Sequence, residues 1–533
     1  MSEFGEAAAL ADWFRIQARM QPRAPALTYL DRVTTRAGFD RHASMVANGL
    51  TALGVTRQER IGYIGKNSDL YFELLAGSFK ANVVLVPVNW RLAPPEAAAI
   101  LRDAGVGVLF VGPGFTAMAL SLEAEGYAAR HAFSMDSASS DGRDLDGADA
   151  SGWPDFATWR DAQTDTDPQV AIDPADTAMQ VYTSGTTGLP KGVELSNANI
   201  LAFLKDYRTG CLRGLGPSDV VLICMPVFHV AGSFIGLASL ALGCSGIVMP
   251  EVNVDSLLGL IPRHQVTFVF LVPAVVLALV QHTEAARTEF SSLRRLVYGA
   301  SPIADDTLLR ARALLPGVAF WQVYGATETS ATGTTLPPEH HQGGMLRSCG
   351  RPYPGVGVRV VDASGEDVPA GDVGEIVMRA EAVMKGYWKQ AEATRAAFFP
   401  GGWLRTGDAG YFDADGLLYI HDRVKDMIIT GAENVYPAEV ENVLFGHPAV
   451  ADAAVIGVPD ERWGEAVKAI VVPKPGQVPT EAEIIRFVRG RIAGFKTPKS
   501  VDFVAALPRN PSGKVLRRQL RAPYWAGRTR NVG

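Results

Sequence analysis

The stretch "YTSGTTGLPKG", residues 182–192, contains three glycines, four serine or threonine residues and one lysine. The preceding "MQVY", residues 179–182, is typical of a strand, so we expect the stretch to form a loop at a strand end. Glycines let backbone N–H groups approach a ligand closely, while hydroxyls and Lys191 add donors and a positive charge. The composition therefore suits a polyphosphate.

On its own the stretch leaves two interpretations open. It is not a Walker A loop, because Pro190 precedes Lys191 and Gly192 follows it. Clusters of Gly, Ser and Thr are usually flexible surface loops, so that interpretation stands beside the phosphate loop until other motifs are considered.

Size and composition narrow the class of protein. A chain of 533 residues exceeds one hydrophobic core, so at least two domains are expected. The net charge of -6 disfavours nucleic acid as a partner. The four cysteines form no CxxC pair, which fits a reducing compartment with neither a disulfide framework nor a zinc site.

Targeting and membrane signals are weak in this sequence. We interpret the first 20 residues as an amphipathic helix, not a signal peptide. The longest apolar run, "FVFLVPAVVLALV" from Phe268 to Val280, is too short to span a bilayer and is interrupted by Pro273, so it predicts a strand followed by a helix. We expect a cytoplasmic protein; the basic C-terminal tail is compatible with peripheral membrane contact, although solvation is the commoner state, and a homodimer stays open.

Apolar runs alternate with helical segments over the first three fifths of the chain. "RIGYIG" and "ANVVLVPVNW" are typical of buried parallel strands in βα units. Residues 134–154, rich in Ser, Asp and Gly, predict an exposed loop. Short alternating runs between residues 350 and 380 predict a small antiparallel sheet, and an α+β pattern follows from about Val424.

Six further motifs follow the glycine-rich stretch, in the order "MPVFHVAG" at Met225, "YGASPI" at Tyr298, "QVYGATETS" at Gln322, "GWLRTGDAG" at Gly402, "DRVKDMIITGAENVYPAEVE" at Asp422 and "LPRNPSGKVLRR" at Leu507. Together the motifs resemble those of the adenylate-forming superfamily, which includes acyl-CoA synthetases, the luciferases and the adenylation domains of peptide synthetases. The resemblance covers nearly the whole chain.

The resemblance implies a fold and a reaction. The fold is α/β: a large N-terminal AMP-binding domain, residues 1–424, of layered, mostly parallel sheets with helices plus a small antiparallel sheet, and a mobile α+β lid, residues 425–533. The reaction joins a carboxylic acid to a thiol through an acyl-adenylate. It uses ATP and coenzyme A as co-substrates and Mg²⁺ as the cofactor. The protein must chiefly position the reactants and stabilise charge on the phosphoryl oxygens.

Several residues match positions that act on the phosphates in the family. Lys514 resembles the mobile lysine that reaches the α-phosphate, although Pro-Ser-Gly-Lys is otherwise an ordinary surface turn. Glu328 matches the magnesium-binding glutamate and Thr327 lies close to the α-phosphate; "TETS" is also compatible with a helix N-terminus. The residues that the resemblance assigns to the phosphate loop are Thr183, Ser184, Gly185, Thr186, Thr187, Gly188 and Lys191.

Other residues match positions that bind the nucleoside in the family or that take part in the rotation of its C-terminal domain. Tyr324, followed by Gly325, would stack on adenine, and Asp408 would accept hydrogen bonds from both ribose hydroxyls. Gly299, Ala300 and Ser301 would line the adenine site and Arg423 would contact the ribose. His229 would lie beside the acyl tunnel, although a lone histidine in an apolar run is more often a satisfied core residue. Lys425 would be the hinge, and Gly431 would enter the site after rotation of the C-terminal domain.

The acid and the acceptor are less determined. Trp463, Phe495 and Lys496 resemble positions that hold the CoA nucleotide, while packing within the lid is an equal use for Trp463. The apolar segment from Val227 to Gly243 has no aspartate for an ammonium group, which favours a hydrophobic acid, most similar to fatty-acid substrates. The alternatives are an aryl acid and an enzyme that loads a carrier protein.

Overall fold

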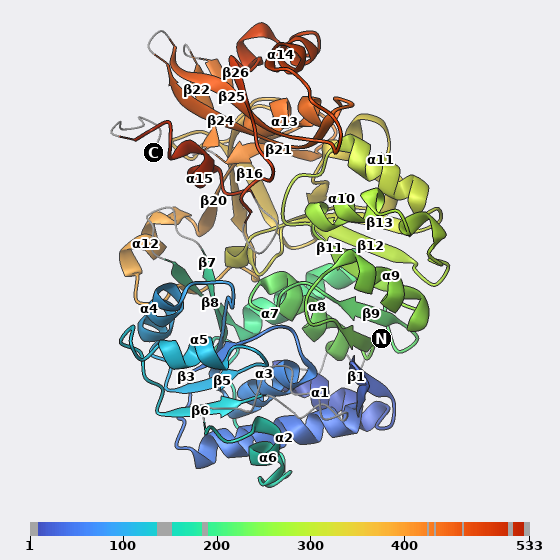
Figure 1. The fold of residues 1–533 in the computed structure, drawn as a ribbon. Helices are drawn as coiled ribbons and strands as arrows, with labels where there is room; N and C mark the ends of the chain where they lie inside the picture. The colour runs from blue at the N-terminus through green and yellow to red at the C-terminus, as the bar shows by residue number, and fades with distance from the viewer. Residues whose placement is uncertain are drawn as a thin grey trace.

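A computed structural model describes residues 9–135, 152–183, 190–423, 426–430, 433–460, 463–509 and 515–526. Two large sheets and their helices form the N-terminal part, a smaller antiparallel sheet lies beside them, and an α+β unit forms the C-terminal part (Figure 1). This architecture confirms the predicted fold class. The predicted exposed loop lies largely outside the described residues, whereas the basic tail is described up to residue 526 and begins with a short helix, Arg517–Arg521.

The first large sheet, within the described residues, has the order β15-β14-β13-β12-β11-β9-β10-β1-β2, with parallel pairing from β1 to β13 and antiparallel strands at both edges. Its strands are β1 (Pro25–Tyr29), β2 (Arg32–Thr35), β9 (Val220–Ile223), β10 (Ser245–Val248), β11 (Phe268–Leu271), β12 (Arg295–Gly299), β13 (Ala319–Tyr324), β14 (Thr334–Leu336) and β15 (Arg351–Pro352). The predicted strand-then-helix at Phe268 is confirmed, because β11 is followed by α10 (Pro273–Gln281), with Pro273 in its first turn.

The second large sheet has the order β18-β8-β7-β4-β3-β5-β6. Its strands are β3 (Arg60–Ile64), β4 (Val84–Val88), β5 (Val108–Val111), β6 (His131–Ser134), β7 (Thr177–Thr183), β8 (Lys191–Ser196) and β18 (Gly386–Tyr387). Strands β4, β3, β5 and β6 are parallel, as the valine-rich runs predicted, whereas β7, β8 and β18 pair antiparallel. The glycine-rich stretch is thus the connection of the β7–β8 hairpin.

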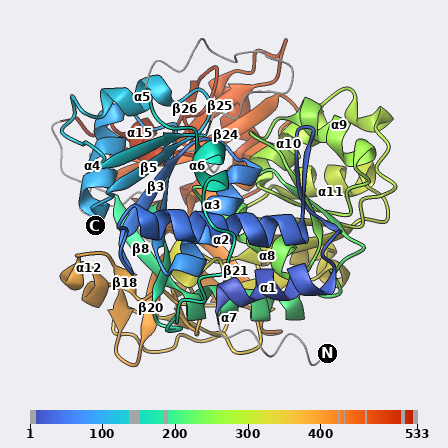
Figure 2. The ribbon, with the colours of Figure 1, turned by 90° about the horizontal axis from the view of Figure 1, so that it is seen from below.

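Helices fill the space between the two sheets and cover their outer faces, with α1 and α2 side by side (Figure 2). The helices of this part are α1 (Leu10–Met20), α2 (Arg36–Ala52), α3 (Asp69–Ala81), α4 (Pro94–Ala104), α5 (Thr116–Ser121), α6 (Phe156–Asp161), α7 (Asn197–Thr209), α8 (Val230–Ala241), α9 (Val254–Arg263), α11 (Asp305–Leu314) and α12 (Ala391–Ala396). The predicted N-terminal amphipathic helix is confirmed over α1, which buries Trp13 and Phe14. One hydrophobic core is shared by both sheets.

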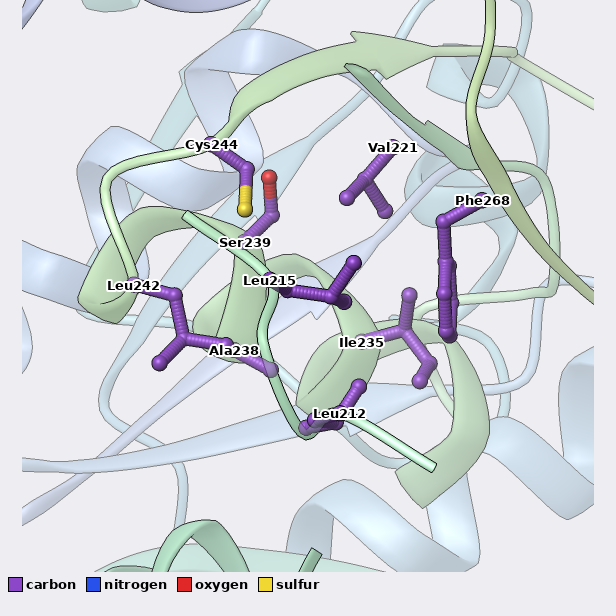
Figure 3. A pocket seen from close by; sticks show the side chains of 9 residues that line it. All are labelled: Leu212, Leu215, Val221, Ile235, Ala238, Ser239, Leu242, Cys244 and Phe268. Carbon is purple, nitrogen blue, oxygen red and sulfur yellow. The ribbon is translucent and has the colours of Figure 1, made fainter. Parts of the chain in front are cut away.

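Helix α8 is packed tightly against the first sheet. A small apolar pocket behind it is lined by Ile235, Ala238 and Ser239 of the helix and by side chains from β9, β11 and adjacent loops (Figure 3). The pocket has no room for a water molecule, and Gly236 on the same helix lies against the ring of Phe72 from α3. The core side of α8 is therefore closely packed at these positions.

The remaining elements form two smaller sheets. The antiparallel sheet contains β16 (Gly357–Val361), β17 (Gly374–Arg379), β19 (Phe398–Phe399), β20 (Trp403–Phe412) and β21 (Leu418–Arg423). The C-terminal unit contains β22 (Ile428–Thr430), β23 (Glu433–Val435), β24 (Val450–Asp460), β25 (Gly464–Pro473) and β26 (Ser500–Phe503), with α13 (Pro437–Phe445), α14 (Glu481–Arg489) and α15 (Arg517–Arg521). The two predicted patterns are confirmed, and the C-terminal unit has a core of its own.

Candidate active site

The site lies at one edge of the first sheet, where parallel strands β9, β12 and β13 end. Gly299 of β12 pairs in register with Val323 of β13, so the loops that follow the two strands leave side by side. Ligands commonly bind at the carboxyl ends of strands in open α/β sheets. Helix α8 starts at this edge too, after the loop that leaves β9, and His229 is its N-cap residue.

At two glycines of this edge, Gly299 and Gly325, the surrounding backbone leaves no space for a side chain. A Cβ on Gly299 would lie 2.3 Å from the carbonyl oxygen of Val323, and one on Gly325 would lie 2.4 Å from the carbonyl carbon of Ala331. Ala300 has φ +69, a left-handed conformation that disfavours alanine. Ser301, half-buried, follows it. The two loops are thus held in a close and locally strained arrangement, as is common around binding sites.

Tyr324 and Asp408 meet across two sheets. The Tyr324 hydroxyl donates to Oδ2 of Asp408 at 2.7 Å, and Asp408, on β20, is 7% exposed. Burial, followed by the charge of Asp408, holds the pKa of Tyr324 well above its usual range, so the phenol keeps its proton and remains a donor. Arg423 pairs in register with Asp408 through the backbone of β21. The two residues predicted for adenine and ribose are therefore adjacent.

The β7–β8 hairpin contributes Lys191 to a second cluster. Thr183 at the end of β7 pairs in register with Lys191 at the start of β8. The Lys191 ammonium lies over the ring of Tyr387, 4.7 Å from its centroid. Tyr387 in turn donates its hydroxyl proton to Oε1 of Glu328 at 3.1 Å. Lys191 and Glu328, predicted from distant motifs, thus contact one common side chain.

Glu328 and Thr327 belong to a single 3₁₀ turn, Thr327–Thr329, directly after β13. The alternative prediction, a helix N-terminus at "TETS", corresponds to this short turn and not to a longer helix, and its N-cap is Ala326. Among the described residues Glu328 forms no ion pair, and no group of three or more His, Cys, Asp or Glu side chains gathers there or elsewhere. One carboxylate fits Mg²⁺ if phosphate oxygens and water complete the shell, as is usual for Mg²⁺ bound with nucleotides.

His229 is not a satisfied core histidine. Its Nε2 is buried and has no hydrogen-bond partner among the described residues. Burial, assisted by the charge of Arg91, lowers the pKa of His229 to about 4, so the ring is neutral near neutral pH. A buried ring nitrogen without a hydrogen-bond partner is uncommon, which distinguishes His229 from the satisfied core residue that a lone histidine predicts.

The residues predicted for the acceptor lie in the C-terminal unit. Trp463 is 41% exposed and Phe495 is 38% exposed, so packing alone does not use their rings fully. Lys496 forms two short contacts with the carboxylate of Glu439, at 2.7 and 2.9 Å. In this conformation the ammonium is already paired, and an acceptor phosphate would have to compete with Glu439 for it.

Part of the prediction lies outside the described residues: Ser184, Gly185, Thr186, Thr187 and Gly188 of the glycine-rich loop, Lys425, Gly431 and Lys514. Conversely, the sequence did not reveal Tyr387, because "GYWK" has no periodicity and its strand is two residues long. It also did not reveal the buried pair Tyr298 and His341, in which the tyrosine hydroxyl lies 3.0 Å from Nε2. The sequence pointed to this pair only through Tyr298, which begins the motif "YGASPI" and directly precedes Gly299.

Comparison with known proteins agrees with this geometry. The model of the AMP-binding enzyme family matches residues 14–388, and that of the AMP-binding enzyme C-terminal domain matches residues 439–514. The chain belongs to the AMP-binding enzyme family. The first match contains the β7–β8 hairpin, Tyr324, Glu328 and Tyr387, and the second contains the acceptor candidates.

Three similar proteins span nearly the whole chain. A fatty acid–[acyl-carrier-protein] ligase, ScoC, of Streptomyces coeruleorubidus is 38% identical over 97% of this chain and 96% of its own. A feruloyl-CoA synthase of an Amycolatopsis species is 37% identical over 97% and 99%. The ATP-bound crystal structure of MatB from Rhodopseudomonas palustris superposes with TM-score 0.85 at 30% identity, over 96% and 99%.

These findings confirm that this AMP-binding enzyme belongs to the adenylate-forming superfamily and is an acid–thiol ligase that uses ATP. Within the described part of the chain, no helix combines the length and the apolar character needed to cross a membrane. The cytoplasmic location, the peripheral membrane contact and the homodimer stay predictions.

Proposed function

We propose that the protein ligates a hydrophobic carboxylic acid, a medium- or long-chain fatty acid, to coenzyme A through an acyl-adenylate. The observation that carries the proposal is the pair of clusters around the end of β13. The nucleoside half, Tyr324 and Asp408, and the phosphate half, Lys191, Tyr387 and Glu328, are joined by Tyr324 and Glu328 on one short segment. Such an arrangement fits a nucleotide with its base on one side and its phosphates on the other.

The chemistry has two displacements. A carboxylate oxygen of the acid attacks the α-phosphorus of ATP, the bond to the bridging oxygen breaks, and pyrophosphate leaves. The thiol sulfur of coenzyme A then attacks the acyl carbon and loses its proton, and AMP leaves as the bond between the acyl carbon and the phosphate oxygen of the mixed anhydride breaks. Carboxylates are poor electrophiles, so the first step supplies the leaving group for the second.

The chain's own groups would bind and orient the phosphates. Thr327 would donate to the α-phosphate, Lys191 and the glycine-rich loop would hold the β- and γ-phosphates, and Lys514 would reach the α-phosphate during adenylation. Mg²⁺ at Glu328 would offset the charge of the triphosphate. Asp408 and Arg423 would hold the ribose, and Gly299 to Ser301 the adenine.

A hydrophobic acid follows from the surface where α8 begins. The helix sequence "VAGSFIGLASLA" has no charged residue, and His229 at its N-cap is neutral. A buried ammonium group on the acid would find no carboxylate on this helix, which is costly. The fatty acid ligase of Streptomyces coeruleorubidus supports an aliphatic acid, whereas the feruloyl-CoA synthase supports an aryl acid as the alternative.

Coenzyme A is proposed as the acceptor on the exposed rings of Trp463 and Phe495, which a nucleotide base can stack on. The alternative is a carrier protein, which is the acceptor named for the Streptomyces coeruleorubidus ligase.

We propose that the boundary between the AMP-binding domain, residues 1–424, and the lid, residues 425–533, lies at Lys425. Rotation there would exchange Lys514 for the loop at Gly431 between the two steps.

The deciding experiment supplies ATP, Mg²⁺ and coenzyme A with straight-chain fatty acids, cinnamates and benzoates, and measures AMP and acyl-CoA. Turnover that peaks on straight chains supports the proposal, and turnover on aryl acids alone replaces the acid. Pyrophosphate release without a CoA thioester replaces the acceptor, and purified acyl carrier protein is then the next substrate to supply.

A single variant tests the two-step scheme. Lys514→Ala should slow adenylation about 10³-fold, because one charge that stabilises the transition state is lost. Thioester formation from a supplied acyl-adenylate should continue at the original rate. Lys499→Ala, an exposed lysine of the same unit, is the control and should change neither step. Loss of both steps in the Lys514 variant would contradict its assigned role.

A further inference from the structure

Tyr387 contacts both charged members of the phosphate half. It lies on β18, while Lys191 lies on β8 and Glu328 in the 3₁₀ turn after β13. Its ring face carries the Lys191 ammonium at 4.7 Å from the centroid, and its hydroxyl donates to Glu328 at 3.1 Å. The two contacts use different parts of one side chain.

The backbone around Tyr387 is fixed on several sides. Its N–H donates to the hydroxyl of Thr394 at 2.9 Å, and it pairs in register with Val193 of β8. The next residue, Trp388, donates its N–H to the carbonyl of Gly192 at 2.8 Å. A Cβ at Gly386 would lie 2.8 Å from Thr394, so the chain has little freedom on the other side as well. The ring is therefore anchored next to the start of β8.

Glu328 is tied to the same segment by its backbone. The N–H of Met384, three residues before Tyr387, donates to the carbonyl oxygen of Glu328 at 2.8 Å. The segment itself is held by Asn199, whose side-chain amide donates to the carbonyl oxygens of Glu381 and Val383 at 2.7 and 2.8 Å. Both ends of the contact between Tyr387 and Glu328 are thus set by hydrogen-bonded backbone.

The side chain of Tyr387 lies against two opposite charges. Lys191 and Glu328 form no ion pair among the described residues, although both lie against the same ring. A direct ion pair between them would withdraw both charges from a ligand. A phenol is suited to separate them, because its ring face attracts an ammonium and its O–H orients one carboxylate oxygen.

We propose that Tyr387 is a positioning residue that separates Lys191 from Glu328 and orients the Glu328 carboxylate for a divalent cation carried by a nucleoside triphosphate. This inference rests on the proposed function. It assigns two separable contributions, since the hydroxyl acts on the metal side through Glu328 and the ring acts on the phosphate side through Lys191.

Two substitutions separate these contributions. Tyr387→Phe keeps the ring and removes the hydroxyl, whereas Tyr387→Leu removes both. The measurement is the dissociation constant of α,β-methylene-ATP, which adenylation does not cleave, with Mg²⁺ and with EDTA, beside that of AMP. Tyr387→Phe should lower the enhancement by Mg²⁺ about 10-fold and leave AMP and metal-free binding unchanged. Tyr387→Leu should also weaken metal-free binding of the analogue.

Two further variants make the result specific. Glu328→Gln should remove the Mg²⁺ enhancement, and adding Tyr387→Phe to it should have no further effect, because the hydroxyl acts through Glu328. Tyr524→Phe is the matched control: its hydroxyl donates to Asp502 in the C-terminal unit, so a bond of the same kind is lost elsewhere. This control should keep the full Mg²⁺ enhancement.

The outcomes are distinct. An unchanged Mg²⁺ enhancement in Tyr387→Phe overturns the inference and leaves the proposed function intact. Equal weakening of AMP, metal-free and metal-bound analogue, together with a lower melting temperature, also overturns it, because that pattern marks a structural residue. If the unsubstituted protein bound neither AMP nor the analogue, the proposed function itself would fail, whatever Tyr387 does.

Discussion

The two halves of the candidate site are built from different interactions. In the nucleoside half, Tyr324 and Asp408 are joined by a direct hydrogen bond of 2.7 Å between two sheets. In the phosphate half, Lys191 and Glu328 carry opposite charges, and each of them contacts Tyr387. The first half is complete without a ligand, whereas the second keeps its charges available for a charged one. Nucleoside recognition should therefore be independent of metal and phosphate recognition dependent on it.

The largest effect should come from the nucleoside half. Asp408→Ala removes both predicted ribose contacts and leaves the buried Tyr324 hydroxyl without its acceptor, so affinity should fall about 100-fold for ATP and for AMP alike. Equilibrium competition with a fluorescent nucleotide measures both. Asp415→Ala, an exposed carboxylate in the β20–β21 turn, removes the same charge and should change neither. Loss of ATP binding with AMP binding intact would place Asp408 at the phosphates instead.

Next in size is the effect of crowding the loop that joins the halves. Gly325→Ala places a Cβ 2.4 Å from the backbone of Ala331, so the free energy of unfolding should fall by about 1–3 kcal/mol. Gly259→Ala, within α9 and open on all sides, is the control and should be neutral or stabilising by up to about 1 kcal/mol. Chemical denaturation compares the two, and equal stabilities would show that the loop is not tightly held.

These differences explain what the sequence could predict. The buried strands and the loop at the end of β7 follow from local patterns, and the family resemblance of the motifs predicts that Lys191, Tyr324, Glu328 and Asp408 bind a nucleotide. The contact between Tyr324 and Asp408 spans 84 residues and depends on how two sheets pack, which no local pattern encodes. Tyr387 escaped for the same reason, because its role arises from a two-residue strand that pairs with β8.

A smaller effect should appear in the phosphate half. Lys191→Ala should weaken ATP about 10-fold, since one charge-assisted contact to phosphate is lost, and leave AMP unchanged. Lys389→Ala is the control, because this nearby ammonium already contacts the carbonyl oxygen of Asp103 at 3.0 Å. The same competition assay applies. Equal weakening of ATP and AMP by Lys191→Ala would remove the distinction between the two halves.

The smallest effect concerns the buried pair formed by Tyr298, which directly precedes Gly299, and His341. The Tyr298 hydroxyl donates to Nε2 of His341 at 3.0 Å, and Nδ1 of His341 donates to the carbonyl oxygen of Pro337 at 2.9 Å. Burial lowers the pKa of His341 to about 4, whereas a histidine in an unfolded chain titrates near about 6.5. As the pH falls, the unfolded chain binds the proton first. The stability from neutral His341 is thus complete above about pH 6.5 and is lost toward pH 4.

Chemical denaturation at about pH 7.5 and about pH 6 measures this contribution, with His341→Gln as the variant that keeps an acceptor for Tyr298 and does not titrate. The unsubstituted protein should lose about 1 kcal/mol more than the variant between the two pH values. His229, whose pKa is also lowered to about 4, is present in both proteins and cancels in the comparison. Equal losses would mean that His341 titrates alike in the folded and unfolded chain. The nucleoside half would then lack the neutral, buried support that distinguishes it from the charged phosphate half.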